Sequence, residues 1–152
     1  TLLLAALISS IVLALGTAIF SIAQKELTLS SVGRNSQFAF YAAYTAAACA
    51  LYWDVRQAAF ATSSDLHTPV PITCAQTTPT ITFVGTPNSQ AATSTFTLNA
   101  TSTNCAIVTV AKSKNPSTNG IVTVIRADGL SSGCTTYLTD PQALQRSVEL
   151  HY

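Results

Sequence analysis

The sequence carries little charge, and its opening segment carries none. Only 9% of its 152 residues are Asp, Glu, Lys or Arg, whereas an ordinary soluble domain has roughly 25%. The first charged residues are Lys25 and Glu26. The net charge of +1 gives no electrostatic reason to expect a nucleic acid or an acidic partner.

The residue patterns that several kinds of binding and catalysis require are also absent from the sequence. The chain has no Gly-rich phosphate loop, no paired carboxylates and no CxxC spacing. Its two histidines, His67 and His151, stand in different contexts, so exposed polar residues are expected rather than a metal pair or a catalytic triad. Ser64 and Asp65 lie so close to His67 that helix capping explains them better than catalysis. We therefore expect no enzyme, no metal and no cofactor.

The uncharged opening, residues 1–24, is strongly apolar. As a helix it would be roughly 36 Å long, enough to cross the ~30 Å hydrocarbon core of a bilayer. No basic n-region precedes it and no A-x-A site ends it, as a cleaved signal peptide would require. Residues of this kind must lie in lipid or against other copies of the chain. Single-pass anchoring and helix bundling both remain open at this point.

Helical periodicity continues past Lys25 to Ala61 without a proline. The sequence therefore predicts one helix of about 60 residues, in which Gly16–Thr17 is the place where helix would most readily be lost locally. Three regions are expected. They are an apolar helix half at 1–26, an amphipathic helix half at 27–61, and a globular antiparallel β domain at 62–152.

Pro69 and Pro71 end the helical pattern, and β-prone runs follow. Residues 105–112 and 121–127 flank a turn that contains Asn119-Gly120, which predicts a hairpin. Further strands are expected at 81–85, 94–100 and 147–152, giving four or five antiparallel strands in an α+β fold. We expect the amphipathic helix half to cover this sheet. The side chains predicted to pack between them are Phe38, Tyr41, Tyr52, Trp53 and Phe60.

The four cysteines predict two disulfides, because a small domain beyond a membrane is the usual setting for them. Cys49 lies near the end of the expected helix and Cys74 follows the Pro-rich return. We prefer Cys49–Cys74 with Cys105–Cys134. Each bond would close a loop worth roughly 3 kcal/mol in the chain-entropy model. Cys49 joined to Cys105 or Cys134 would contradict this pairing.

An apolar helix that becomes amphipathic, followed by a small disulfide-bonded antiparallel sheet, resembles the type IV pilin family. The likeness covers the whole chain in layout and is strongest over residues 1–61. There TLLLAALISSIVLALGTAIF is similar to the start of a pilin after prepilin peptidase cleavage. Thr1-Leu2 would match the family if a methylated phenylalanine preceded Thr1. The blocks FAFYAAYTAAACALYWD and RSVELHY are also similar to a bacterial pilin subgroup.

The resemblance implies a structural subunit of a type IV pilus, a fimbrium that serves adhesion, motility or DNA uptake. The subunit would sit in the inner membrane as a single-pass protein, meet prepilin peptidase and the pilus assembly machinery, and then polymerise with its own copies into a helical filament on the cell surface. The residues expected in the filament core are Leu2, Leu3, Leu4, Leu7, Ile8, Ile11, Val12, Leu15, Gly16, Ile19 and Phe20.

One departure from the family concerns a glutamate that most pilins carry a few residues into the helix. Leucines fill this region here, and the first acid is Glu26. A minor pilin or a type II secretion pseudopilin, which primes or caps a fibre, is therefore the alternative within this class. A monomeric, membrane-tethered binding module is the alternative from another class.

Two surface features have a structural and a functional interpretation. Lys112 and Lys114 near the hairpin turn form a small basic spot. A solvated tip is expected there, and contact with DNA is the weaker alternative. Asn99-Ala100-Thr101 is a glycosylation sequon in a Thr-rich stretch. Threonine on exposed strands explains the same residues without a glycan.

Overall fold

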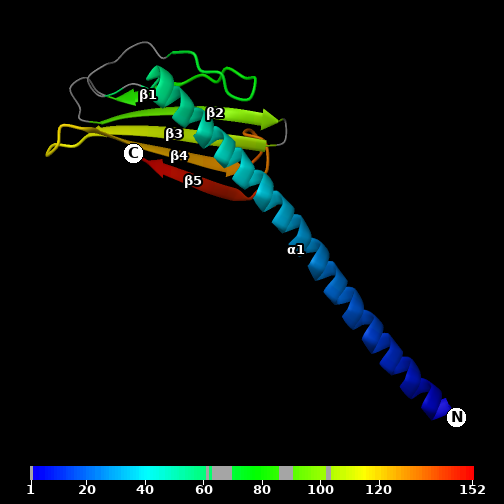
Figure 1. Ribbon diagram of the computed structural model, residues 1–152. Coiled ribbons are helices and arrows are strands. Elements are labelled where there is room, and N and C mark those ends of the chain that lie inside the picture. The colour runs from blue at the N-terminus through cyan, green and yellow to red at the C-terminus, as the bar shows by residue number, and fades with distance from the viewer. Residues whose placement is uncertain (1, 61, 63–69, 86–90, 102–103) are drawn as a thin grey trace. The chain divides into compact units, whose positions relative to one another are not determined.

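The structure is a computed structural model that describes residues 2–60, 62, 70–85, 91–101 and 104–152 (Figure 1). The chain forms one long apolar N-terminal helix and a five-stranded antiparallel sheet, an α+β layout. It divides into two compact units, Thr1–Arg34 and Asn35–Tyr152. The first unit is helix alone, and the second holds the end of that helix and the sheet.

Helix α1 spans Leu2–Gln57 and so ends four residues before the predicted position. Ala58 adopts a left-handed conformation with φ of 46°, which turns the chain out of the helix. The amide of Ala59 then donates to the Trp53 carbonyl at 3.2 Å. In the single chain α1 is continuous through Gly16–Thr17, and a local loss of helix there within an assembly stays a prediction.

The sheet consists of β1 (Thr82–Gly85), β2 (Ala91–Thr101), β3 (Asn104–Lys114), β4 (Ile121–Leu130) and β5 (Gln145–His151). The strands lie in sequence order and each pairs antiparallel with the next. The predicted hairpin is confirmed as β3 and β4. Its turn closes with the Asn115 amide donating to the Gly120 carbonyl at 2.8 Å, while Asn119 takes the left-handed conformation that asparagine tolerates.

One face of the sheet packs on the second half of α1 (Figure 1). Strand β2 shows the alternation most clearly, because Phe96 and Leu98 are buried whereas Thr97 between them is exposed. Apart from Asp54, the buried residues of the helix on this face are all alanines. The buried alanines of α1 are Ala39, Ala42, Ala43, Ala46, Ala47 and Ala50.

Gly129 on β4 explains why the contact uses alanine. A Cβ atom added to Gly129 would lie 2.9 Å from the Cβ of Ala43 and closer still to the Ala39 carbonyl oxygen. The helix backbone therefore approaches the sheet at a distance that admits no side chain at this point. Because large residues would hold the two layers apart, alanine occupies the helix face that meets the sheet.

The expected helix–sheet packing of three aromatic residues is accordingly wrong. Phe38, Tyr41 and Tyr52 are exposed, with 46% to 64% of their surface accessible. Alanines and aromatic residues both recur at three- and four-residue steps along α1, so the spacing is compatible with either face meeting the sheet. In the structure the alanine face meets it. Trp53 packs against the core from a half-buried position. Phe60 is buried and stacks on Phe96, but it lies beyond the end of α1.

Two disulfides join Cys49 to Cys74 and Cys105 to Cys134, which is the pairing preferred from the sequence. The first disulfide joins Cys74, in the segment before β1, to Cys49 on α1. In the same place the indole nitrogen of Trp53 donates to the Thr73 carbonyl at 3.1 Å. The second disulfide ties the start of β3 to the loop after β4.

We predict that Gly129→Ala destabilises the domain, because the new methyl group has no space between β4 and α1. Overpacking of this kind costs about 1 to 3 kcal/mol, measured as the change in free energy of denaturant unfolding. Gly120→Ala is the matched control, since a Cβ there meets only the Thr118 hydroxyl at 3.4 Å. Equal stability of the two variants would contradict the close contact.

Candidate assembly surfaces

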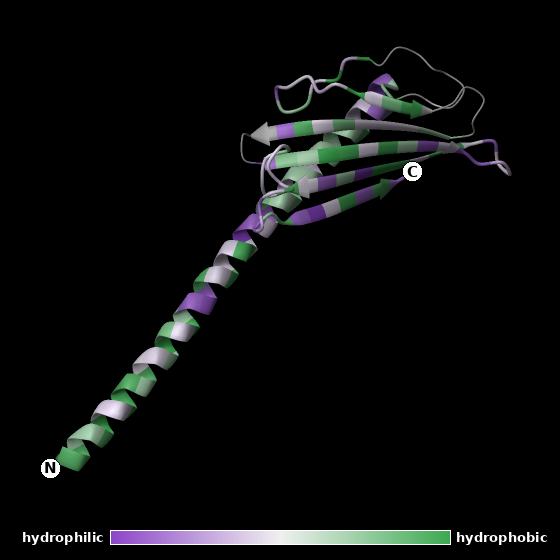
Figure 2. Ribbon diagram, turned by 180° about the vertical axis from the view of Figure 1, so that it is seen from behind, coloured by the Kyte–Doolittle hydropathy of each residue, from purple (hydrophilic) through white to green (hydrophobic). Residues whose placement is uncertain are grey.

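The first unit of the chain exposes nearly every large apolar side chain it has. All the expected filament-core residues are on the surface of α1, and Figure 2 shows hydrophobic colours along most of this stretch. By length and composition α1 is apolar enough to cross a membrane. Other exposed apolar residues of this unit are Leu13, Ile22, Leu27, Leu29 and Val32.

Five hydroxyl groups of this unit are bonded within the helix itself. Ser9 donates to the Ala5 carbonyl at 2.8 Å, and Thr17 donates to the Ala14 carbonyl at 2.9 Å. Bonds of the same kind involve Ser10, Thr28 and Ser31. Because these donors are satisfied locally, the helix surface can enter lipid or a protein bundle without leaving those hydroxyl protons unbonded.

Gly16 leaves a hollow in the surface of the first unit. Its wall and floor are formed by Ile8, Ser9, Val12, Leu13, Gly16, Thr17 and Phe20. No atom lies within 4 Å of the place where a Gly16 side chain would stand. Small residues at such positions allow a second helix to approach closely.

The second unit presents an outer aromatic face on α1, formed by Phe38, Phe40, Tyr41, Tyr44, Tyr52 and Val55. Phe40 contacts Tyr41 edge to face and stacks on Tyr44, with ring centroids 6.0 and 6.3 Å apart. No charged residue occurs from Asn35 to Trp53. An uncharged aromatic surface of this kind usually marks an interaction site.

A buried ionic cluster holds the end of α1 to the sheet. The Lys112 ammonium lies 2.5 Å from Oδ1 of Asp54, and both side chains are more than 90% buried. The Tyr152 hydroxyl donates to Oδ2 of the same carboxylate at 2.6 Å. The expected basic spot of Lys112 and Lys114 is therefore wrong, because Lys112 points into the domain.

This cluster was not predicted, although the sequence contains a signal for it. Along β3 the buried side chains alternate from Ala106 through Val108 and Val110 to Lys112. Lys112 therefore occupies an inward position of the strand and needs an acidic partner. Asp54 is the acid nearest the end of α1, and only the fold brings it to this strand.

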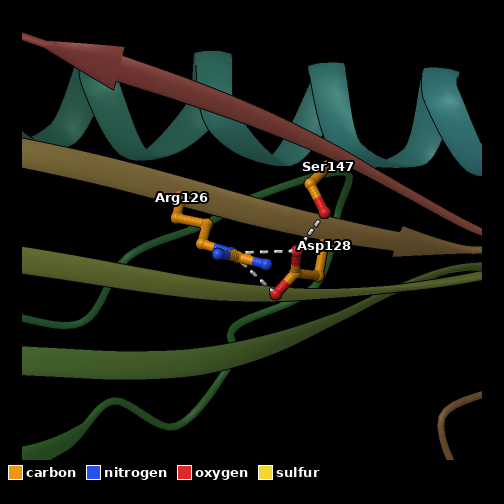
Figure 3. Close-up of polar contacts among 3 residues, drawn as sticks. All are labelled: Arg126, Asp128 and Ser147. Carbon is orange, nitrogen blue, oxygen red and sulfur yellow. Dashed lines mark hydrogen bonds and ion pairs between the residues drawn. The ribbon is translucent and has the colours of Figure 1, made fainter.

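A second polar cluster lies on β4 and β5, where Arg126, Asp128 and Ser147 meet (Figure 3). The Arg126 Nε donates to Asp128 at 3.2 Å, and the Ser147 hydroxyl donates to the same carboxylate. Burial alone would raise the pKa of Asp128. The hydrogen bonds from Ser147 and Arg126 and the arginine charge outweigh burial, so this pKa is lowered. An ion pair along β4, together with a cross-strand hydrogen bond from Ser147 on β5, accounts for the arrangement as support for the sheet.

The remaining predicted site residues do not come together. His151 is exposed with its ring nitrogen 2.6 Å from Glu149, and His67, Ser64 and Asp65 lie outside the described residues. Among the described residues no group of three His, Cys, Asp or Glu side chains could hold a metal. Asn99 is exposed on β2, and its glycosylation stays a prediction.

Comparisons of the chain with models of protein families, with characterised proteins and with solved structures found no match.

We predict that Lys112→Met strongly destabilises the domain. The substitution leaves the Asp54 carboxylate buried beside Tyr152 without its cation, and breaking a buried pair in this way costs about 3 to 5 kcal/mol. The free energy of unfolding checks this. Lys114→Met is the control, because Lys114 is exposed two residues further along the same strand. In the double variant Asp54→Asn with Lys112→Met, part of the loss should be recovered.

A pH titration tests the hydroxyl of the same cluster. Burial, the hydrogen bond to Asp54 and the negative charge of Asp54 all raise the pKa of Tyr152. Its neutral form is thus favoured in the folded state, so the interaction stabilises the fold below the ordinary pKa of about 10. That stability is lost as the pH rises through the higher pKa of the folded state.

Tyrosinate absorbance measured against pH should therefore contain one late-ionising tyrosine in the folded protein. We expect Tyr152→Phe to remove this late step and Tyr137→Phe to leave it in place. If the Tyr152→Phe variant still shows the late ionisation step of the wild-type protein, the Tyr152 hydroxyl is not held by Asp54.

Proposed function

We propose that this chain is a structural subunit of the type IV pilin kind, which polymerises into a helical filament through the apolar half of α1. The observation that carries the proposal is the exposure of the apolar side chains of residues 2–34. Burying roughly 20 such side chains yields on the order of 1 to 2 kcal/mol each before entropic costs. A monomer in water leaves these side chains exposed and gains none of this free energy of burial.

The layout of the chain supports a polymer rather than a closed oligomer. Copies that leave one membrane run in the same direction, so each helix presents one face to the copy before it and another to the copy after it. A contact between two different faces that does not close into a ring continues as a helical filament. The sheet-bearing unit, held by two disulfides, would then form the outside of the fibre.

The same proposal covers where the protein is found and whether it catalyses a reaction. Before assembly the subunit would lie in the inner membrane through α1, and afterwards on the cell surface in the filament. Adhesion, motility or DNA uptake would be properties of the fibre, and the chain itself would catalyse no reaction. A minor pilin or pseudopilin would use the same helix at the end of a fibre.

Shearing cells that make this chain and imaging the released material tests the proposal. Abundant fibres that consist of this chain are the expected result. Traces of the chain in fibres made of another subunit would favour a minor pilin. A protein that leaves the cell only in detergent, and stays monomeric when the detergent is removed, would favour a tethered binding module and overturn the filament.

We further predict that Val12→Glu abolishes fibres, because a carboxylate cannot be buried unpaired in the apolar bundle. Val84→Glu is the matched control. Both valines are exposed to the same degree, 63% and 65%, but Val84 lies on β1. The sheared fraction is measured by immunoblot and microscopy, with the membrane fraction as a measure of synthesis. Fibre yields that fall equally in both variants would contradict the role of α1.

A further inference from the structure

Only three charged residues occur in α1 before its last turn, and they lie within nine residues of one another. Between Leu2 and Trp53 the helix carries Lys25, Glu26 and Arg34. All three are exposed, and among the described residues none of them takes part in an ion pair. Glu26 is the single acid of this stretch.

Within its own chain Glu26 has no suitable partner. Lys25 is the adjacent residue, so its side chain points to a different side of the helix. Arg34 is eight residues further along, about 12 Å away along the helix axis. A carboxylate that is covered by another apolar helix loses its water and needs an opposite charge. A second copy of the chain can supply that charge.

The sequence of α1 limits how a second, parallel copy can supply it. Pairing Glu26 with Lys25 requires a shift of one residue, or about 1.5 Å, which places the copies side by side and adds almost no length. Pairing with Arg56 requires a shift of 30 residues, and less than half of α1 then overlaps. Pairing with Arg34 requires a shift of eight residues, which advances the polymer and keeps most of the helix in contact.

We propose that Glu26 of one copy forms an ion pair with Arg34 of a second, parallel copy that is displaced by eight residues along the helix axis. The pair fixes the register between neighbouring subunits, and this inference rests on the proposed function. The two residues lie about 80° apart around the helix axis and about 12 Å apart along it, so a contact that joins one to the other displaces and turns each copy relative to the last and repeats without closing. Arginine suits the role because its planar guanidinium binds a carboxylate through two hydrogen bonds.

Charge reversal tests the pair in cells that make fibres of the wild-type chain. Glu26→Arg alone and Arg34→Glu alone should each lower the sheared fibre by about tenfold or more, because like charges then meet in an apolar interface. The double variant E26R/R34E restores the opposite charges and should recover fibres. Arg56→Glu, at an exposed arginine near the end of the same helix, is the control and should leave the yield unchanged.

Immunoblots of the membrane fraction separate lost assembly from lost subunit. Full yield in either single variant, or no recovery in the double variant while subunit is present in the membrane, overturns the pair and leaves the filament proposal intact. Absence of fibres from the wild-type chain would instead overturn the filament proposal itself.

Cysteine cross-linking measures the same shift without altering the charges. Ile22 lies one turn before Glu26, and Ser30 lies one turn before Arg34, so these two residues are also eight residues apart. All four native cysteines are in disulfides, so the added thiols have only each other. Oxidised fibres of Ile22→Cys with Ser30→Cys should give a ladder of covalent multimers on a non-reducing gel, and either single variant should not. Intact fibres of the double variant without a ladder would refute the eight-residue shift.

Discussion

The second unit of this protein depends on the close approach of α1 to strand β4. Gly129 has no room for a side chain beneath Ala39 and Ala43, so the helix lies on the sheet through a row of alanines. This constraint decides where the other side chains of the helix go. The aromatic residues are too large for the contact and turn away from it, which leaves Phe40, Tyr41 and Tyr44 in contact with one another on the outer aromatic face. Packing of the domain thereby creates a surface that the domain itself does not cover.

Both units consequently share one property, a long helical surface that is apolar and nearly free of charge. Residues 2–24 have no charge at all, and none occurs from Asn35 to Trp53. In the first stretch the hydroxyl groups of Ser9, Ser10 and Thr17 are bonded to the helix backbone, so they do not require water. Such a surface is stable in lipid and costly in water. Other copies of the same helix offer this surface surroundings as apolar as lipid. We therefore favour a polymer over a permanent anchor.

How much of this was predictable differs from element to element. The long helix followed from its helical periodicity and the absence of proline, and the β3–β4 hairpin from the turn residues around Asn119, because both signals are local in the chain. The preferred cysteine pairing also agrees with the structure, since each bond joins segments that a short return brings together. The identity of the packing face did not follow, because both the alanines and the aromatics recur at helical spacing. Only the glycine on β4, which is distant in sequence, selects between them. Lys112 was misplaced for a related reason, since its charge suggested the surface while its position in the strand alternation points inward.

Several polar and covalent attachments of α1 to the rest of its unit lie in the last turns of the helix. Cys49 is bonded to Cys74, Trp53 donates to the Thr73 carbonyl, and Asp54 binds Lys112 and the C-terminal Tyr152. These contacts differ in strength and kind, since one is covalent, one is a hydrogen bond and one is a buried ion pair. If subunits of the proposed fibre hold one another through residues 2–34, a pull on the second unit is borne in part by these contacts between α1 and that unit. A covalent bond, a hydrogen bond and a buried ion pair would then act together with the alanine packing against separation of the helix from its domain.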